Sequence, residues 1–456
     1  MTKDRIWIFA RSALIALAAA ATGRAQDSAP TTVRAAYPDA TLDAFVAEAL
    51  QKNGDVAASV ASAEAASSRI SPAQTLPDPF LSFNYQNDGW AFSLGERDMT
   101  FLGATFAQPL PWPGKLRLAG EEAAQRAEEV RVGEVGRARL SVEGRVRRAY
   151  WEYLLAREQL LLIEDRDRAW RQIADVARER YAVGLGAQQD ALRAQVEVLR
   201  LDEARADEGA RAANRRAALD RLLGRPQDAP IKTTQHLELR PEIPPTPALL
   251  DAVKGRSPEL AALENAIEAG RSRVALTKKA FLPDFVASGG PMYRGSLDPM
   301  WQVGVGVTLP IHVGSRQKPL LAAAEADVRS QESRLASAAL DLELRTRERL
   351  ENLSAAVRVA GLYKDGVVPT DELSLESAIA SYRTGKVPFV TVLEALNALY
   401  ADRALYLSRL ADAEKWRADI DEAAWNETPG MPRERPGAGA AMTNAAARLE
   451  SAAGMR

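Results

Sequence analysis

The chain has 456 residues, 46% of them hydrophobic, so it can bury a sizeable core and is not a disordered tail. Its 59 basic and 61 acidic side chains nearly cancel, which argues against nucleic acid or another bulk polyanion as a partner. Cysteine is absent, which excludes disulfides, thiolate metal sites and cysteine nucleophiles. Because the two histidines, His236 and His312, lie far apart in sequence, we expect no cofactor, no bound metal and no enzymatic activity.

The first residues have the pattern of an export signal. Basic residues at positions 3, 5 and 11 precede an apolar stretch from Ser12 to Ala21, and small residues stand just before Gln26. This stretch is about half of the ~20 residues that a membrane-spanning helix needs, so a single membrane anchor fits less well. We therefore predict a signal peptide over residues 1–25. An exported chain without cysteine points to the periplasm or the outer membrane of a double-membraned bacterium.

Short proline and glycine motifs recur about 200 residues apart. The recurring motifs are Leu76-Pro77-Asp78 and Leu282-Pro283-Asp284 at an offset of 206, Leu110-Pro111 and Leu309-Pro310 at 199, and Tyr181 to Gly184 and Tyr382 to Gly385 at 201. Three matches in the same order indicate a tandem duplication. We predict a first repeat over residues 26–224, a Pro-rich linker over 225–247, a second repeat over 248–424 and a disordered tail over 425–456.

Each repeat is predicted to contain a helix, two strands and then long helices. In the first repeat a helix from Thr41 to Ser71 ends at prolines, and period-2 alternation of apolar and polar residues predicts strands over 81–86 and 100–108. Residues 115–183 contain no proline, which predicts a helix on the order of 100 Å long at 1.5 Å per residue. After a break at glycines, residues 188–223 continue as a helix.

The second repeat is predicted to follow the same order. It has a helix over 249–281, strands over 285–293 and 301–309, and long helices broken near Gly366 and at Gly385. The last strand places Trp301 and alternate valines on one face and small or polar residues on the other. Taken alone, that strand fits either a soluble sandwich or a strand that faces lipid.

Four strands per chain are too few to close a barrel. A sheet in a bilayer cannot leave its edges unpaired, because lipid offers no hydrogen bonds, so several chains would have to share one barrel. Two chains would give eight strands, whose interior side chains nearly fill, whereas three would give 12 strands and leave room for a lumen.

The order of elements resembles that of the TolC family of outer-membrane efflux channels, over residues 41 to 424. The motifs that carry the resemblance are Leu110 to Lys115, Tyr181 to Gly186 with Asp190, and Tyr382 to Gly385 followed by Val392-Leu393-Glu394. The resemblance implies a mainly α fold with a small β part, in which tandem-duplicated long α-helical hairpins plus two β-hairpins form an α-barrel and a shared 12-stranded transmembrane β-barrel as a trimer.

The resemblance also implies a location and partners. The channel would lie in the cell outer membrane with a periplasmic helical tunnel, as a homotrimer surrounded by outer-membrane lipid. It would work with a periplasmic adaptor, also called a membrane fusion protein, and with an inner-membrane pump of the RND type. We expect no nucleic acid among its partners.

A gate at the two glycine-marked hairpin tips is a further implication of the resemblance. Tyr382 and Asp190 match a tyrosine and an aspartate that help to hold the entrance shut, through a phenol hydroxyl that donates to a carboxylate. Glu394 matches one acidic residue of the constriction, whereas Thr391 stands where the family has a second one. Val387 stands where some members have an arginine that stabilises the closed tip.

The hairpin tips themselves are expected to contact the adaptor. The residues in question are Gly184, Leu185, Gly186 and Gly385. Tight backbone turns explain the glycines equally well, so a structural role and an adaptor contact are both open.

The segment Pro111-Trp112-Pro113-Gly114-Lys115 is most similar to the heavy-metal cation branch of the family. We therefore expect passive conduction of heavy-metal cations. Drug or solvent efflux and type I secretion by a channel of the same fold are alternatives. In a different class, a periplasmic coiled-coil scaffold would explain the helices and the signal but not two β-hairpins flanked by prolines.

Overall fold

The proline-free part of the first repeat is helical except for the turn between α5 and α6. The computed structural model describes residues 40–94, 97–227, 229–233 and 235–422, which belong to one compact unit. The helical segments of this part are α4 (Lys115–Val130), the π-helical turn η1 (Arg131–Val135), α5 (Gly136–Ala182) and α6 (Gln188–Leu223). The predicted signal peptide (1–25) and tail (425–456) lie outside the described residues.

The second repeat shows the same order of long helices. They are η2 (Val313–Gln317), α9 (Lys318–Leu362), η3 (Tyr363–Val367), α10 (Val368–Arg383) and α11 (Phe389–Asp421). The predicted break near Gly366 is wrong, because α9, η3 and α10 follow one another without a gap. A π-helical turn adds a residue to a helix without ending it, so a glycine and a proline are accommodated there.

The predicted helix that precedes the strands in each repeat, over 41–71 and over 249–281, is divided by a capping residue. The elements are α1 (Ala40–Lys52), α2 (Gly54–Ser68), α3 (Ile70–Gln74), α7 (Thr246–Arg256) and α8 (Pro258–Lys279). The side chain of Asn53 accepts a hydrogen bond from the N–H of Asp55 at 2.9 Å, and Ser257 caps α8 in the same way. The helical class of both segments was predicted correctly, but capping side chains start a new helix within each.

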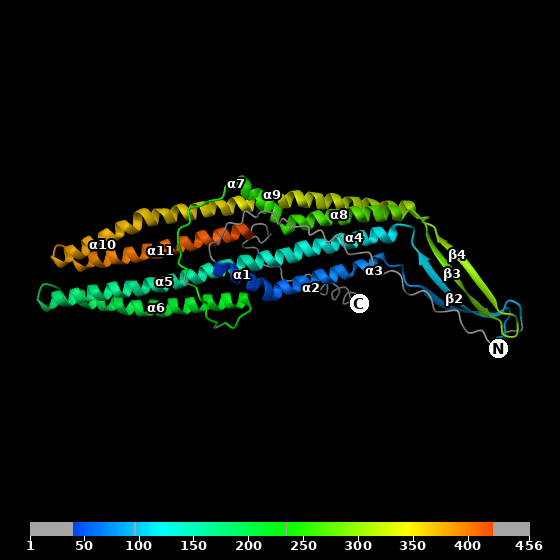
Figure 1. Ribbon diagram of the computed structural model, residues 1–456, viewed down its shortest axis with the longest axis horizontal. Helices are drawn as coiled ribbons and strands as arrows, with labels where there is room; N and C mark the ends of the chain where they lie inside the picture. The colour runs from blue at the N-terminus through cyan, green and yellow to red at the C-terminus, as the bar shows by residue number, and fades with distance from the viewer. Residues whose placement is uncertain (1–39, 95–96, 228, 234, 423–456) are drawn as a thin grey trace, which may run out of the picture. The chain divides into compact units, whose positions relative to one another are not determined.

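Four strands form one antiparallel sheet in chain order. They are β1 (Phe80–Gln86), β2 (Phe101–Leu110), β3 (Asp284–Tyr293) and β4 (Met300–Thr308). The prediction that the second strand ends at residue 108 is wrong, because β2 continues through Pro109, which lies opposite Val286, to Leu110. Figure 1 shows the sheet at the end of the helices that lies away from the hairpin tips.

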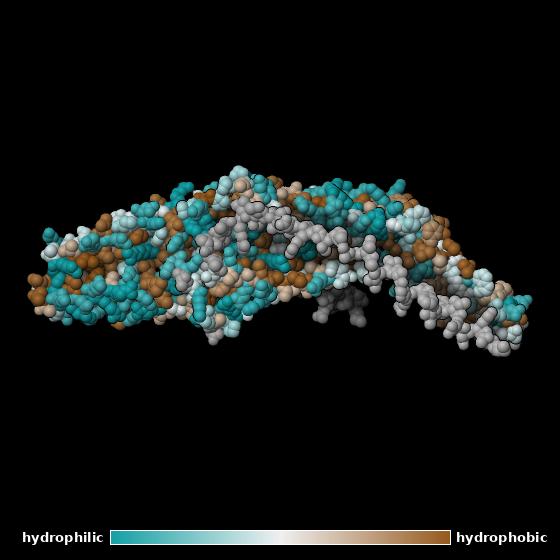
Figure 2. Space-filling view, viewed as in Figure 1, coloured by the Kyte–Doolittle hydropathy of each residue, from teal (hydrophilic) through white to brown (hydrophobic). Residues whose placement is uncertain are grey.

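One face of the sheet exposes large apolar side chains. Phe83, Trp301 and Val303 are 75%, 77% and 74% exposed, and Figure 2 shows hydrophobic residues gathered at the surface over the strands. An apolar patch of this kind marks contact with lipid or with another protein. None of the helices within the described residues combines the length and the apolar character that crossing a membrane requires.

A polar joint connects the sheet to the helices and links the two repeats. The ammonium group of Lys115 donates to both carboxylate oxygens of Asp284, at 2.7 and 2.9 Å. The backbone N–H of Trp112 donates to the same carboxylate at 2.7 Å. The ring of Trp112 stacks on that of Phe285, with the ring centroids 5.8 Å apart. The Pro-Trp-Pro-Gly-Lys segment of the first repeat thus binds the Leu-Pro-Asp segment of the second.

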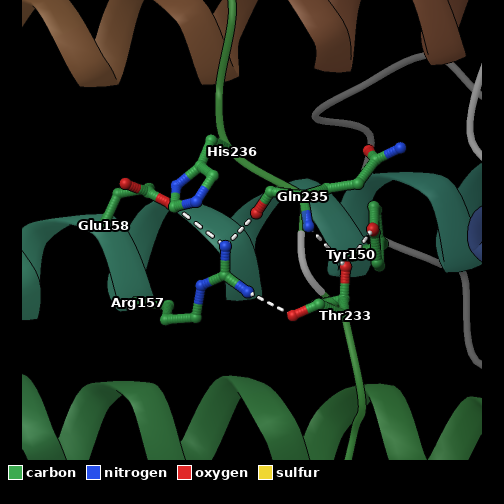
Figure 3. A network of polar contacts seen from close by, with 6 residues as sticks. All are labelled: Tyr150, Arg157, Glu158, Thr233, Gln235 and His236. Atoms are coloured by element: carbon green, nitrogen blue, oxygen red, sulfur yellow. Dashed lines mark hydrogen bonds and ion pairs between the residues drawn. The ribbon is translucent and has the colours of Figure 1, made fainter.

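The linker between the repeats crosses α5 as an extended segment. Figure 3 shows Arg157 donating to the backbone carbonyl oxygens of Thr233, at 2.9 Å, and of Gln235. The ring Nδ1 of His236 lies 2.8 Å from a carboxylate oxygen of Glu158. A single arginine thus satisfies two linker carbonyls that the extended chain leaves without a backbone partner.

Arginines also hold the two ends of the linker. Arg225 donates to Glu48 of α1, with Nε at 3.0 Å, and this hydrogen bond, together with one from Lys52, lowers the pKa of Glu48 to about 2. At the other end Arg417 of α11 donates to the carbonyl of Glu242 at 2.9 Å. The linker is therefore tied to helices of both repeats.

We predict that the sheet depends on Gly290 and tolerates a change at Gly306. A Cβ atom at Gly290 would lie 1.8 Å from the carbonyl oxygen of Ala104, whereas one at Gly306 would meet nothing closer than 3.7 Å. Gly290→Ala should lower the free energy of unfolding by at least about 1–3 kcal/mol, because overpacking forces β2 and β3 apart. Thermal melts followed by circular dichroism compare the two variants, and equal melting temperatures would contradict the prediction.

Candidate functional site at the paired hairpin tips

Both helical hairpins end in the same glycine turn. Gly184 and Gly385 have φ values of 76° and 75°, in the left-handed region that favours glycine. After each turn a backbone N–H returns to the preceding helix, from Leu185 to Arg180 and from Lys386 to Ser381, both at 2.9 Å. The two predicted tips are therefore built alike, at the end of α5 and at the end of α10.

Gly186 lies close to α5. A Cβ atom there would lie 3.0 Å from Cβ of Arg180 and 3.1 Å from the backbone nitrogen of Tyr181. A larger residue at position 186 would therefore require its neighbours in α5 to shift slightly. Leu185, beside it in the turn, is 69% exposed.

A hydrophobic cluster joins the two hairpins behind their tips. It consists of Trp170, Ile173, Ala174, Ala177, Ala194, Leu201, Ala378, Tyr382, Phe389, Val392, Leu396, Leu399 and Tyr400. These residues come from α5, α6, α10 and α11, and α5 contacts α11 directly. Val387 packs against the same cluster, so the position that carries arginine in some channels is apolar here.

The structure brings Tyr382 and Asp190 together. Tyr382 is only 4% exposed, and its hydroxyl donates to the carboxylate of Asp190 at 3.2 Å. Burial, followed by the negative charge of Asp190, raises the pKa of Tyr382 above its usual value, so the hydroxyl keeps its proton and can donate. A hydrogen bond to a charged acceptor contributes about 1.5–3 kcal/mol, enough to favour one arrangement of the hairpins and still be broken.

Arg180 spans the two tips and was missed by the sequence analysis. Its Nη2 donates to the carbonyl of Leu185 in its own tip at 2.8 Å, and its Nη1 donates to the carbonyl of Arg383 in the other tip at 2.6 Å. Its guanidinium carbon lies 4.8 Å from the ring centroid of Tyr382. In the sequence it is one of many arginines on α5, so only the folded tips distinguish it.

Thr391 and Glu394 are not part of this contact. The N–H of Thr391 donates to the carbonyl of Pro388 in the first turn of α11. Glu394 lies one turn further on and is exposed, and its side chain has no hydrogen-bond or ion-pair partner among the residues that the structure describes. Its carboxylate is therefore available to solvent or to a passing cation.

A second tyrosine–aspartate pair joins the same helices further from the tips. The hydroxyl of Tyr400 donates to Asp165 at 2.9 Å, and burial raises the pKa of Tyr400 to about 12. Beside it, Arg166 donates to the side chain of Asn397 at 2.7 Å. Because these residues carry no motif, nothing in the sequence distinguishes them from the solvated charges around them.

Together the Tyr382–Asp190 contact and the two hydrogen bonds of Arg180 form a polar link between the tips, which is called the latch below. Charged and phenolic groups link two hairpins through hydrogen bonds that can be exchanged for water. In the described part of the chain no three histidine, aspartate or glutamate side chains are grouped so as to hold a metal ion.

We predict that Arg180→Ala loosens both tips. The variant loses hydrogen bonds to two carbonyls, each worth about 1.5–3 kcal/mol, so amide exchange at residues 184–186 and 384–386 should accelerate roughly tenfold or more. Hydrogen exchange followed by mass spectrometry measures this. Arg178→Ala is the matched control, because Arg178 pairs only with Asp175 of its own helix among the described residues. Equal exchange in the two variants would show that Arg180 does not hold the tips.

Comparison with known proteins places these features in a family. The model described as "Outer membrane efflux protein" matches residues 45–225 and 249–424. The cobalt-zinc-cadmium resistance protein CzcC of Cupriavidus metallidurans is 24% identical over 393 residues, which cover 86% of this chain and 91% of that protein. The alkaline protease secretion protein AprF of Pseudomonas aeruginosa is 29% identical over 225 residues, 46% of this chain and 44% of AprF.

A solved structure agrees with the family match. The outer membrane protein VceC of Vibrio cholerae superposes with a TM-score of 0.68 at 17% identity, over 85% of this chain and 97% of that chain. The resemblance to the TolC family is thereby confirmed, as are the mainly helical fold and the absence of an enzymatic role. The chain therefore belongs to the outer membrane efflux protein family and is an outer-membrane channel whose helices extend into the periplasm.

Proposed function

We propose that this channel releases heavy-metal cations, which reach it from an inner-membrane pump of the RND type through a periplasmic adaptor. The observation that carries the proposal is the match to a cobalt-zinc-cadmium resistance protein along nearly the full length of both chains. The charge of the exposed Glu394 is compatible with this cargo, since an acidic ring on a channel axis attracts cations.

The working unit in this proposal is a homotrimer. Each chain supplies a sheet of four strands with an exposed apolar face, and three copies would close a sheet of 12 strands within the outer-membrane lipid. The long helices of three chains would line a periplasmic tunnel that continues from the sheet, and the paired tips of each chain would surround its entrance.

In this proposal the latch sets the resting state of the entrance. Tyr382 and Asp190 hold the two hairpins of one chain together, and Arg180 adds a second link. Arg180 would thus compensate for Val387, which stands where some family members have an arginine. Opening requires the hairpins to separate at the tips, which breaks these hydrogen bonds. Such a latch shifts a population between two states when a partner binds one of them better.

The tips are also the proposed contact for the adaptor. Val183 and Leu185 are 68% and 69% exposed next to the glycine turn of the first hairpin. Exposed apolar side chains on a rigid turn suit a groove between the helices of another protein. An adaptor that packs there would pull on the segment that Arg180 holds.

We predict that the double variant Tyr382→Phe with Asp190→Ala raises the ion conductance of the purified channel in a planar bilayer. The change removes the inter-hairpin hydrogen bond and leaves the buried ring in place, so the ratio of open to closed channels should rise about tenfold or more for a loss of about 1.5–3 kcal/mol. Tyr181→Phe is the control, because Tyr181 is 48% exposed at the same tip. Conductance equal to that of the control would remove the pair from the gate.

We predict that a strain without this protein is more sensitive to zinc, cobalt and cadmium than its parent. Growth inhibition is measured beside copper, silver, dyes, detergents and antibiotics, and a plasmid copy of the gene should restore resistance. Sensitivity confined to organic compounds would replace the metal assignment with drug or solvent efflux. Loss of a secreted protein without any change in sensitivity would favour a secretion channel, the role that the name of AprF indicates for that relative.

A further inference from the structure

The two hairpins of the sheet share one register when the offsets between the repeats are applied. Moving β1 forward by 206 residues and β2 forward by 199 residues turns the pair Phe80–Ala107 into Val286–Gly306, which is a pair of the second hairpin. All seven pairs of the first hairpin map onto pairs of the second in this way. Offsets read from the proline motifs therefore describe the strand geometry.

Within the chain, the join between the two hairpins combines strand pairing with an ion pair. In this join β2 pairs with β3, and Gln108 lies opposite Ala287. At its base Lys115, five residues after the end of β2, binds Asp284, the first residue of β3, at 2.7 Å. The side chain of Lys115 is only 15% exposed, so this ion pair is partly shielded from solvent.

The outer edges of the sheet carry the counterparts of this join without a partner. β4 corresponds to β2, and β1 corresponds to β3. Among the described residues, the edge strands β1 and β4 each pair with a single strand. Asp78 precedes Asp284 by 206 residues, the offset of β1. Arg316 follows Lys115 by 201 residues, which is the offset of the helical hairpin tips and not the 199 of β2. Both side chains are exposed, and in the described part of the chain neither has a hydrogen-bond or ion-pair partner.

We propose a residue-level register and an ion pair for the join that the trimer forms between β4 of one chain and the first strand of the next. In this arrangement β4 pairs with the first strand of its neighbour so that Val307 lies opposite the partner's Leu81, and Arg316 forms an ion pair with the partner's Asp78. Applying the repeat offsets to the pair Gln108–Ala287 gives this register. The inference rests on the proposed trimer and adds which residues meet in it and how the strands are aligned.

The faces of the strands support this register independently. On β4 the exposed apolar residues are Val303, Val305 and Val307, and on β1 they include Leu81 and Phe83. The proposed register brings these side chains onto one continuous face across the join. A slip by one residue would instead place valines opposite the face of β1 that carries serine and asparagine, so the apolar pattern selects against it.

The need for a partner strand is strongest if the apolar face contacts lipid. An edge strand in a bilayer leaves N–H and C=O groups without hydrogen bonds, at a cost of several kcal/mol each. The charges at Asp78 and Arg316 lie just outside the strands, where an ion pair can mark the end of the sheet. Complementary charge and register therefore point to the same occupant, another copy of the chain.

Introduced cysteines test the register, because the chain has none of its own. Directly opposite residues have Cβ atoms ~4.5–5.5 Å apart, within a small adjustment of disulfide geometry. We predict that full-length protein with Val307→Cys and Leu81→Cys forms a covalent trimer on mild oxidation in the outer membrane. The matched control, Val303→Cys with Leu81→Cys, is four residues out of register and should remain monomeric on a non-reducing gel.

Charge reversal tests the ion pair. Arg316→Glu alone and Asp78→Arg alone should each lower the temperature at which the purified trimer dissociates in detergent, and the combined variant should regain the wild-type temperature. Lys318→Glu changes the charge of a nearby exposed residue and should leave the temperature unchanged.

The outcomes separate this inference from the proposed function. Cross-linking of the control pair, but not of the predicted pair, would overturn the register and leave the trimer intact. Failure of the combined charge reversal to restore stability would remove Arg316 and Asp78 from the interface. A protein that remains a monomer in mild detergent, and is not cross-linked by either cysteine pair, would contradict the trimer itself.

Discussion

The structure depends on the way the two repeats are joined at the sheet. Lys115 and Asp284 fix the start of α4 against the start of β3, so the strands and the long helices of both repeats keep one relative position. From that joint one continuous helical segment runs from Lys115 to Ala182, so the position of the joint also determines the position of the first tip. The helix α5 also packs against α11. The two hairpins can therefore move apart at their tips while they remain in contact nearer the sheet.

The tips and the sheet solve opposite physical problems. The sheet exposes an apolar face and two edge strands, which in the proposed trimer would be covered by lipid and by strands of neighbouring chains. The tips bury a shared cluster and are closed by a few polar contacts that water can replace. In the proposed channel, the sheet would form the permanent assembly in the outer membrane and the latch at the tips would respond to the adaptor and pump.

Much of the fold followed from sequence patterns, and the differences have physical causes. The boundaries of α6 and the four strands followed closely from glycines, prolines and period-2 alternation. Asn53 and Ser257 start new helices because their side chains cap them, and Pro109 stays within a strand, so propensity alone misplaced these points. The Tyr382–Asp190 contact was anticipated through family resemblance, whereas Arg180 acts through backbone carbonyls, which leave no trace in a residue pattern.

The most direct test of the account is the rate at which living cells lose a metal. Cells of the parent and of a strain without this protein are loaded with radiolabelled zinc and transferred to zinc-free medium, and the retained label is followed with time. The account predicts that the strain without the channel retains zinc longer and that the restored gene returns the parental rate. Equal loss of zinc from both strains, together with slower loss of a fluorescent drug from the mutant, would contradict the assignment of heavy-metal cations as its cargo.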